Sequence, residues 1–305
     1  MNIIQKVQND WLNSYAKKSF SQFGEDGILE QIFEIIKGDR WCVEFGAYDG
    51  EHLSNTRNLI VNHGWRGILI EASPERFRKL LETYKGNNRI TCLNKFVDFE
   101  GENSLDSILK ETPVPKDFDL LSIDIDGNDY HIWDLFKIYE PKVVVIEFNP
   151  SIPLDVEFIQ EKDRNINHGN SLLALYNLAI KKEYKLVATT FLNAFFVKKE
   201  LFPLFKINCD APGCIHKDKS AQTQIFQLYD GTLVLRGYNK LLWHQYEINQ
   251  EKFQILPKYL RKFPDKFSRW EYLLSQIYRK IYRGKYKFAL YLIWHRIKNY
   301  FRLKK

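Results

Sequence analysis

Carboxylates crowd the stretch from Asp124 to Trp133, D-I-D-G-N-D-Y-H-I-W, which follows an apolar run. On a strand, Asp124 and Asp126 would point to the same face, and like charges held close together repel and raise one another's pKa. The end of a strand needs no such crowding for stability, so the pattern indicates a functional site. The next apolar run ends in Glu147-Phe148-Asn149-Pro150 and predicts an adjacent strand whose end lies beside the first.

Two kinds of chemistry fit these residues. One is a hard-oxygen site for Mg²⁺, Mn²⁺ or Ca²⁺, with Asp124, Glu147 and Asn149 as ligands. The other is general base catalysis, for which the candidates are Asp124, Asp126, His131 and His168. Structural explanations stay open as well, because an acid can simply meet a cofactor, the Asn-Pro pair can form a turn, and a helical His can face solvent. No Cys/His spacing in the sequence supports zinc.

A second group of residues lies in W-C-V-E-F-G-A-Y-D-G, from Trp41 to Gly50. The order of apolar strand, acid, Gly-rich turn and helix is the first unit of a nucleotide-binding α/β sheet. The pattern Glu44-x-Gly46-x-x-x-Gly50 lacks one glycine of the dinucleotide fingerprint, and its carboxylate repels a pyrophosphate. A carboxylate suits a cation such as S-adenosylmethionine (SAM), which carries an ammonium and a sulfonium. The spacing resembles the first motif of class I SAM-dependent methyltransferases.

Other predicted strands also end in acids. Gly67 to Glu71 is apolar until its last residue, where such sheets hold the ribose hydroxyls of a nucleotide. Asp98 follows a third strand, at the place where the resemblance to methyltransferases implies that adenine would lie. Because the carboxyl ends of parallel strands meet at one edge of the sheet, these acids are expected to line one crevice.

The elements that position these residues alternate between strand and helix over the first 150 residues, as a parallel sheet requires. Tyr184–Thr190 and Ala194–Val197 then predict a closing antiparallel hairpin with its turn at Leu192-Asn193. We therefore predict an α/β fold, a Rossmann-like doubly wound sheet of seven strands, whereas a dehydrogenase sheet usually ends in parallel strands. Helices are predicted over 28–36 and 53–63.

Several ordered motifs resemble those of FkbM-like methyltransferases, in particular the branch encoded among bacterial capsule and surface-polysaccharide genes. They are S-Q-F-G-E-D-G from Ser21, V-E-F-G-A-Y-D-G from Val43, L-L-S-I-D-I-D-G-N-D-Y-H-I-W from Leu120, I-E-F-N-P from Ile146 and N-A-F-F-V from Asn193. The acidic turn, D-I-D-G-N-D from Asp124 to Asp129, departs from the D-x-E-G-x-E common in that family. The Ser21 segment is expected either to contact the cofactor or only to cap the helix that follows it.

The resemblance implies methyl transfer from SAM, usually to oxygen, on a sugar or on a phosphoryl or phosphoramidate group of a surface glycan. A sugar hydroxyl needs a base or metal to lose its proton, whereas an anionic phosphoryl oxygen needs neither. The alternatives are a nucleotide-dependent oxidoreductase and a non-catalytic scaffold with the same fold. The SAM contacts so implied are Gln22, Glu25, Glu44, Gly46, Asp49, Gly50, Glu71, Ala72, Asp98 and Asp124.

Composition and charge bound the rest. Cys42, Cys92, Cys209 and Cys214 lack C-x-x-C spacing, and the first 18 residues lack the apolar run of a signal peptide, so we expect a cytoplasmic protein with reduced thiols. Residues 251–305 hold 16 Lys and Arg against 3 Asp and Glu, whereas residues 1–250 hold 29 against 35.

We predict a methyltransferase domain at 1–205 and a mostly helical extension at 206–305. The extension should contain a hairpin around Tyr229-Asp230-Gly231 and two aromatic, basic helices, Trp270–Arg283 and Tyr286–Tyr300. Their apolar faces predict core or homodimer contacts, with peripheral contact at an anionic inner membrane leaflet as the alternative. Nucleic acid is not expected to bind, because no recognised nucleic-acid-binding fold accompanies the basic residues.

Overall fold

The computed structural model describes residues 8–283 of the chain. It divides into two compact units, Met1–Lys219 and Ser220–Lys305. The boundary lies after residue 219 instead of the predicted 205, because the segment that follows the sheet folds back onto the first unit. Two bonds show this: Trp11 Nε1 donates to the carbonyl of Phe205 at 3.0 Å, and Asn13 Nδ2 donates to the carbonyl of Ile215 at 3.2 Å.

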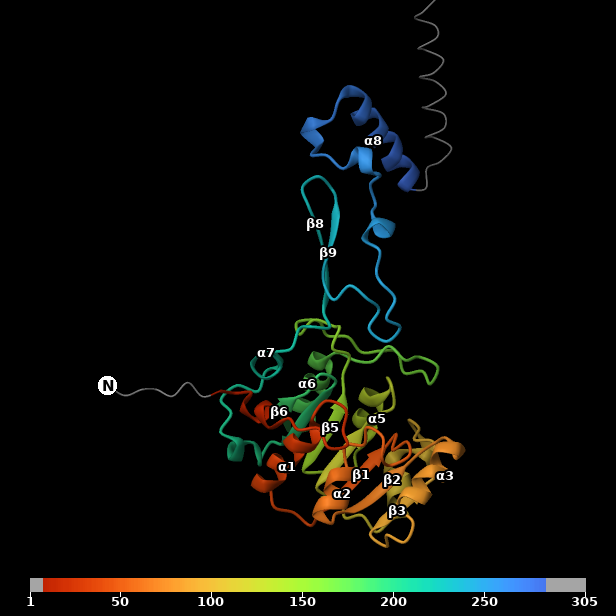
Figure 1. Ribbon diagram of the computed structural model, residues 1–305, viewed down its shortest axis with the longest axis vertical. Helices are drawn as coiled ribbons and strands as arrows, with labels where there is room; N and C mark the ends of the chain where they lie inside the picture. The colour runs from red at the N-terminus through yellow and green to blue at the C-terminus, as the bar shows by residue number, and fades with distance from the viewer. Residues whose placement is uncertain (1–7, 284–305) are drawn as a thin grey trace, which may run out of the picture. The chain divides into compact units, whose positions relative to one another are not determined.

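The first unit is built on a seven-stranded sheet in the order β3-β2-β1-β4-β5-β7-β6 (Figure 1). Strands β1 to β5 pair in parallel, and β7 is antiparallel to both of its neighbours. The predicted seven-stranded doubly wound sheet with a closing hairpin is therefore confirmed. The strands are β1 Trp41–Phe45, β2 Arg66–Ile70, β3 Ile90–Leu93, β4 Leu120–Ile123, β5 Val143–Glu147, β6 Tyr184–Thr189 and β7 Asn193–Lys198.

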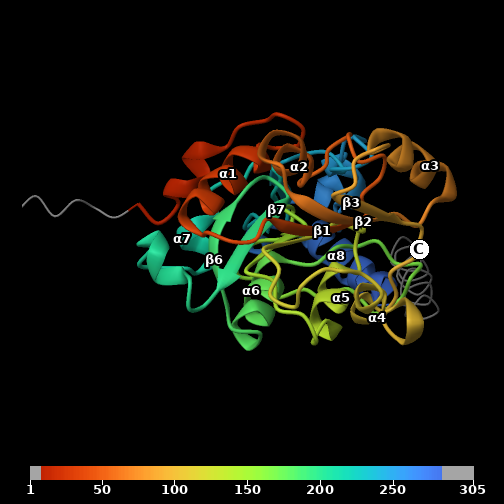
Figure 2. The same ribbon diagram turned by 90° about the horizontal axis from the view of Figure 1, so that it is seen from below.

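Helices cover both faces of this sheet. Figure 2 shows α1, α2 and α3 on one face and α4, α5 and α6 on the other. The helices of the unit are α1 Glu25–Ile35, α2 Arg57–His63, α3 Pro74–Thr83, α4 Leu105–Lys110, α5 Asp129–Leu135, α6 Leu172–Lys181 and α7 Pro212–Ile215. Because both faces are covered, the central strands β1 and β4 are buried along their whole length, as their continuous apolar runs require.

Helix starts follow local rules. Ser73, Ser104 and Ser171 each accept a backbone N–H of the first turn, and Pro74 takes the first position of α3. The predicted 53–63 helix begins only at Arg57, because the polar residues before it bind the side chain of Glu44 instead.

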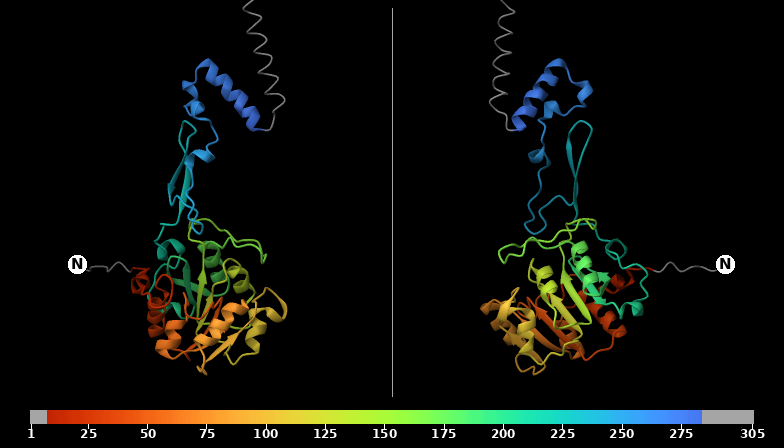
Figure 3. Two further views of the ribbon diagram at one scale, coloured as in Figure 1. Left: turned by 45° about the vertical axis from the view of Figure 1, so that its right-hand side comes forward. Right: turned by 180° about the vertical axis from the view of Figure 1, so that it is seen from behind.

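The second unit contains the hairpin of β8 Thr223–Gln227 and β9 Leu233–Gly237, which confirms the predicted turn (Figure 3). Short 3-10 turns follow, and then helix α8, Arg269–Tyr282, which begins with a capping box of Ser268 and Glu271. Among residues 220–283, α8 is the one α-helix, so the prediction of a mostly helical extension is wrong for this part. The predicted helix Tyr286–Tyr300 lies outside the described residues. Within residues 8–283, no helix is both long and apolar enough to cross a membrane.

The cysteines correct one prediction. Cys42 is buried in β1 and Cys92 is partly buried in β3, and both are free thiols. Cys209 and Cys214 form a disulfide, because the turn that starts α7 brings their Cα atoms to 6.0 Å. The expectation of four reduced thiols is therefore wrong for this pair, and the cysteines give no support to a reducing compartment.

Candidate functional site

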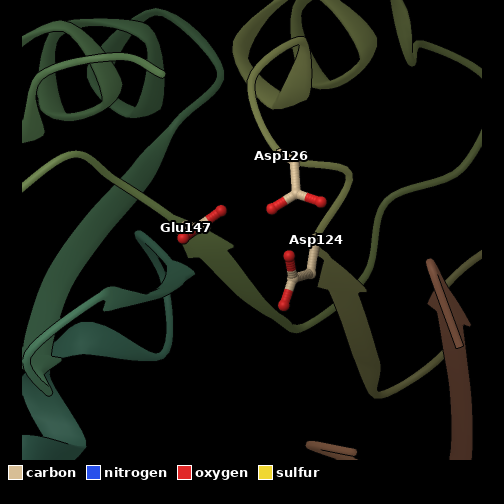
Figure 4. Close-up of side chains that lie close together, drawn as sticks. All are labelled: Asp124, Asp126 and Glu147. Carbon is tan, nitrogen blue, oxygen red and sulfur yellow. The ribbon is translucent and has the colours of Figure 1, made fainter. Parts of the chain in front are cut away.

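Three carboxylates gather where β4 and β5 end. Asp124 follows β4, Glu147 is the last residue of β5, and Asp126 lies in the turn after β4 (Figure 4). One carboxylate oxygen from each lies within 4.8 Å of the others. The parallel register that pairs Ile123 with Ile146 brings the following residues of both strands side by side. The sequence prediction that these two strand ends meet is confirmed.

Burial and neighbouring charges raise the pKa of two of these acids, Asp124 and Glu147. Desolvation, followed by the charges of Asp129 and Asp126, raises the pKa of Asp124 to about 8. Desolvation and the charge of Asp124 likewise raise the pKa of Glu147 well above its usual value. Negative charge on these two carboxyls is therefore disfavoured, and a cation bound beside them would lower their pKa values.

The acidic turn is shaped by Asp129, the first residue of α5. Its two oxygens accept the backbone N–H groups of Ile125 at 3.0 Å and Gly127 at 2.8 Å. Burial raises the pKa of Asp129 to about 6 in spite of these bonds. Asp126 lies in this turn in a left-handed backbone conformation, with φ of 57°. Asp129 thus positions the turn.

Glu44 is buried, and the structure gives it three partners. Its carboxylate accepts Ser54 Oγ at 2.7 Å, Thr56 Oγ1 at 2.7 Å and the N–H of Asn55 at 2.8 Å. Desolvation raises the pKa of Glu44 although these bonds lower it. Glu44 therefore anchors the loop before α2, and its predicted contact with SAM stays a prediction.

The glycines of this loop are needed for two different reasons. Gly46 has φ of 79°, and a Cβ there would lie 1.8 Å from the carbonyl oxygen of Asp124. It keeps the tip of β1 close to the acidic edge. Gly50 has φ of 73°, and its Cβ would meet Leu80 and Tyr84, so this glycine serves packing.

Other predicted nucleotide contacts also hold the loop. Glu71 is buried after β2 and accepts the N–H groups of Tyr48 at 2.9 Å and Ser73 at 2.7 Å. Asp49 accepts the N–H of His52 at 2.7 Å. Ala72 is exposed next to Glu71, and its carbonyl accepts Asn94 Nδ2 at 3.1 Å.

The Ser21 segment is fixed by two buried acids. One oxygen of Asp26 accepts the N–H groups of Ser19, Phe20 and Ser21 and the hydroxyl of Ser21, all within 2.9 Å. Glu25 accepts Thr190 Oγ1 at 2.6 Å and Asn193 Nδ2 at 3.1 Å, and so ties the segment to the β6–β7 turn.

Two buried oxygen atoms of this region have no hydrogen-bond donor among the described residues. The second oxygen of Asp26 and the side-chain oxygen of Asn193 are buried and accept no hydrogen bond from the described residues. Asn193 pairs directly with Glu147 across β7 and β5. Gln22 is half-buried on the same segment. Unsatisfied buried acceptors beside acids suit a ligand that carries N–H donors.

The segment between β5 and α6 is organised by Gln160, which sequence reasoning missed. Its side-chain oxygen accepts the N–H groups of His168 at 2.9 Å and Gly169 at 3.0 Å, and its amide donates to the carbonyl of Ile166 at 2.9 Å. Asn170 Nδ2 donates to the carbonyl of Gly127 at 2.7 Å, which fixes this segment onto the acidic turn. The polar run N-I-N-H-G-N-S after residue 164 was the available signal.

Three predicted acceptor-side residues fall in this region. The Nε2 atom of His131 lies 2.8 Å from the carbonyl oxygen of Gln160 and is engaged there. Asn149 uses its oxygen to accept Ser151 Oγ at 2.6 Å and its amide to bind the carbonyl of His168 at 3.0 Å. The imidazole of His168 is exposed.

Asp98, the residue predicted near adenine, forms an ion pair with Arg164, whose guanidinium also lies 5.8 Å from the ring centre of Phe96.

A divalent cation fits the three carboxylates. Aspartate and glutamate oxygens are the ligands that Mg²⁺ and Mn²⁺ prefer, and a cation would offset the repulsion among them. The predicted third ligand, Asn149, already uses its side-chain oxygen in the turn, so the residue that groups with Asp124 and Glu147 is Asp126.

Comparison with known proteins gives one family match and a set of similar folds. Residues 101–170 match the family model described as the Methyltransferase FkbM domain. No curated protein matches the sequence. The CMeT domain of the citrinin polyketide synthase is 13% identical, with 62% of this chain and 52% of that chain covered and a TM-score of 0.39. This chain thus spans about half the length of that protein.

Two further solved structures are similar. A SAM-dependent methyltransferase from Clostridium acetobutylicum ATCC 824 is 10% identical, with 62% of this chain and 98% of that chain covered and a TM-score of 0.39. The N-terminal domain of EvdMO1 with SAH bound is 11% identical, with 57% and 79% covered and a TM-score of 0.39.

The strand order, with β7 antiparallel between β5 and β6, defines the class: it is the Rossmann-like fold of class I methyltransferases. Within that class, the FkbM match covers the segment that carries the acidic turn and Glu147.

Proposed function

We propose that this protein is a SAM-dependent methyltransferase. The observation that carries the proposal is the FkbM match over residues 101–170, because that segment contains the acidic edge at the ends of β4 and β5. The class I methyltransferase order of the sheet supports it.

The charge of the site supports a cationic donor. SAM supplies a methyl group on a positively charged sulfur. Desolvation and neighbouring carboxylates raise the pKa values of Asp124 and Glu147, and a positive charge beside these two groups would lower them. The free oxygens of Asp26 and Asn193 offer acceptors for an ammonium group.

The acceptor must lose a proton if it is a hydroxyl. Asp124 can take that proton once the positive charge of SAM has lowered its raised pKa, and Asp126 and His168 are the exposed alternatives. His131 is the weakest candidate, because its Nε2 is engaged by Gln160. The remaining work of the chain is alignment of the two reactants by the loops that Glu44, Asp129 and Gln160 hold.

We propose oxygen methylation of a sugar in surface-glycan biosynthesis as the reaction. A neutral hydroxyl can approach Asp124, Asp126 and Glu147 without charge repulsion. A phosphoryl or phosphoramidate oxygen is anionic, and beside these acids it would need a bridging cation. The two acceptors therefore differ in their need for Mg²⁺ or Mn²⁺, which Asp124, Asp126 and Glu147 would hold.

The test compares SAM with S-adenosylhomocysteine, which lacks the methyl group and the positive charge. Isothermal titration of the whole protein is expected to show binding of both, and Asp124→Asn should weaken SAM more than S-adenosylhomocysteine. Glu111→Gln, an exposed acid on the same unit, serves as the control and should change neither. If neither ligand binds with or without Mg²⁺ or Mn²⁺, the proposal is wrong.

Three further measurements separate the alternatives. Binding of NAD in place of SAM would favour an oxidoreductase. Binding of SAM without methylation of any sugar or phosphoryl acceptor would favour a scaffold. Turnover that EDTA abolishes and Mn²⁺ restores would establish that the reaction requires a metal. Turnover that resists EDTA would show that it requires none.

The cytoplasmic location and the homodimer stay predictions.

A further inference from the structure

The second unit exposes an unusual share of large hydrophobic side chains. In the part of the chain that the structure describes, 15 of them lie within residues 220–283, whereas the much longer stretch 8–219 exposes 12. The exposed fractions reach 92% for Tyr229, 72% for Tyr246, 68% for Trp270 and 58% for Trp243. On soluble proteins, exposed apolar side chains that form a contiguous patch usually mark an interaction surface.

Helix α8 shows how these residues are arranged. Trp270, Leu274, Ile277 and Ile281 follow a spacing of four, three and four residues and so share one face of the helix. Ile277 is buried within the unit, and the other three are exposed. Arg279 falls on the opposite side by the same spacing, so α8 is amphipathic and its apolar stripe is only partly covered.

The same unit is basic. Residues 220–283 hold 11 Lys and Arg against 5 Asp and Glu. Two of these acids are neutralised within the unit, since Glu251 pairs with Arg261 at 3.0 Å and Glu271 pairs with Lys262 at 2.5 Å. The unit that exposes these apolar side chains therefore carries a net positive charge.

This combination distinguishes among three partners. A second copy in a two-fold contact would bring the same basic surface against itself. A nucleic acid would neutralise Lys and Arg and stack on Trp and Tyr, but it would leave aliphatic side chains such as Ile225, Leu274 and Ile281 without an apolar partner. An anionic bilayer supplies both phosphates and an acyl boundary, and Trp and Tyr favour that interface.

We propose that the second unit binds the surface of an anionic lipid bilayer through its exposed aromatic and aliphatic side chains and its Lys and Arg residues. The proposal is independent of the methyltransferase reaction, because it uses no residue of the first unit.

The experiment is flotation of the full chain with vesicles of phosphatidylcholine alone or with about one third phosphatidylglycerol, at about 0.15 M salt. We expect binding to the anionic vesicles and little to the neutral ones. Trp270→Ala should weaken binding about ten-fold, since it removes a large apolar side chain from the interface. Arg269→Glu should weaken it at least about five-fold, because Arg269 is exposed and directly precedes Trp270.

Matched variants keep the test specific. Leu274→Ala is compared with Leu204→Ala, because both leucines are exposed but Leu204 belongs to the first unit. Only Leu274→Ala should weaken binding, and circular dichroism should show that both variants fold.

Three results would overturn the proposal. The first is equal binding to neutral and anionic vesicles. The second is anionic binding that neither Trp270→Ala nor Leu274→Ala reduces, which would assign it to residues outside this surface. The third is an absence of vesicle binding together with either self-association that Leu274→Ala abolishes or salt-sensitive binding to nucleic acid.

Discussion

Substitution of Gly46 by alanine tests how tightly the first strand end is held against the acidic edge. The new Cβ would lie 1.8 Å from the carbonyl oxygen of Asp124 and 3.0 Å from its carbonyl carbon. Neither is the far end of a flexible side chain, and β1 and β4 are hydrogen-bonded neighbours through the pair Phe45 and Ile123. The clash can therefore be relieved only by moving a strand end.

Gly86 provides a control for the backbone conformation. Its φ of 81° nearly equals the 79° of Gly46, but a Cβ at Gly86 meets nothing within 4 Å. Both alanines share a left-handed strain of about 1–2 kcal/mol. Only Gly46→Ala adds overpacking, of about 1–3 kcal/mol. We expect the free energy of unfolding to fall by about 1–2 kcal/mol for Gly86→Ala and about 2–5 kcal/mol for Gly46→Ala.

The measurement is thermal unfolding followed by circular dichroism, with SAM titration of the folded variants. For a unit of this size, each 1 kcal/mol lowers the melting temperature by about 2–4 °C. Gly46→Ala should melt clearly below Gly86→Ala and should bind SAM more weakly. Equal melting temperatures for the two variants would refute the close contact between the β1 tip and Asp124.

Three other predictions follow from the buried polar groups. Glu44→Gln places an amide against Ser54, Asn55 and Thr56, which all donate to the carboxylate in the wild type. This change should lower the free energy of unfolding in urea by about 1–3 kcal/mol. An unchanged urea midpoint would contradict the anchoring role of Glu44. Asp124 has a folded pKa of about 8, above the ordinary aspartate value of 3.8, so the folded state binds the extra proton and loses stability as pH rises through this window. Wild type should therefore become less stable relative to Asp124→Asn between pH 5 and pH 8, roughly the span of that shift, and a constant difference in urea midpoint would show that this shift is absent. Gln160→Ala removes the hydrogen bonds to Ile166, His168 and Gly169. It should speed proteolytic cleavage within 151–170, while the melting temperature changes little. Cleavage at the wild-type rate would show that Gln160 does not hold this segment in place.

Local patterns in the sequence were enough for the sheet and for the acids at its edge. Continuous apolar runs such as Val143–Ile146 mark strands buried on both faces, and an acid at the end of each run must lie at the carboxyl edge once the strands are parallel. The closing hairpin of β6 and β7 was readable for the same reason, since strand and turn signals extend over only a few residues.

The tertiary structure decided what each acid contacts. Glu44 and Glu71 look alike in the sequence as acids at strand ends, and in the fold both carboxylates accept hydrogen bonds from neighbouring loops. The carboxylates of Asp124, Asp126 and Glu147 instead lie close to one another. The role of Gln160 and the Cys209–Cys214 disulfide could not be assigned from the sequence, because both depend on how a loop closes on itself. The sequence does not show which N–H or O–H group will lie within 3 Å of a given carboxylate in the folded chain. Those donors belong to other segments, and the packing of the whole unit decides which segments come close.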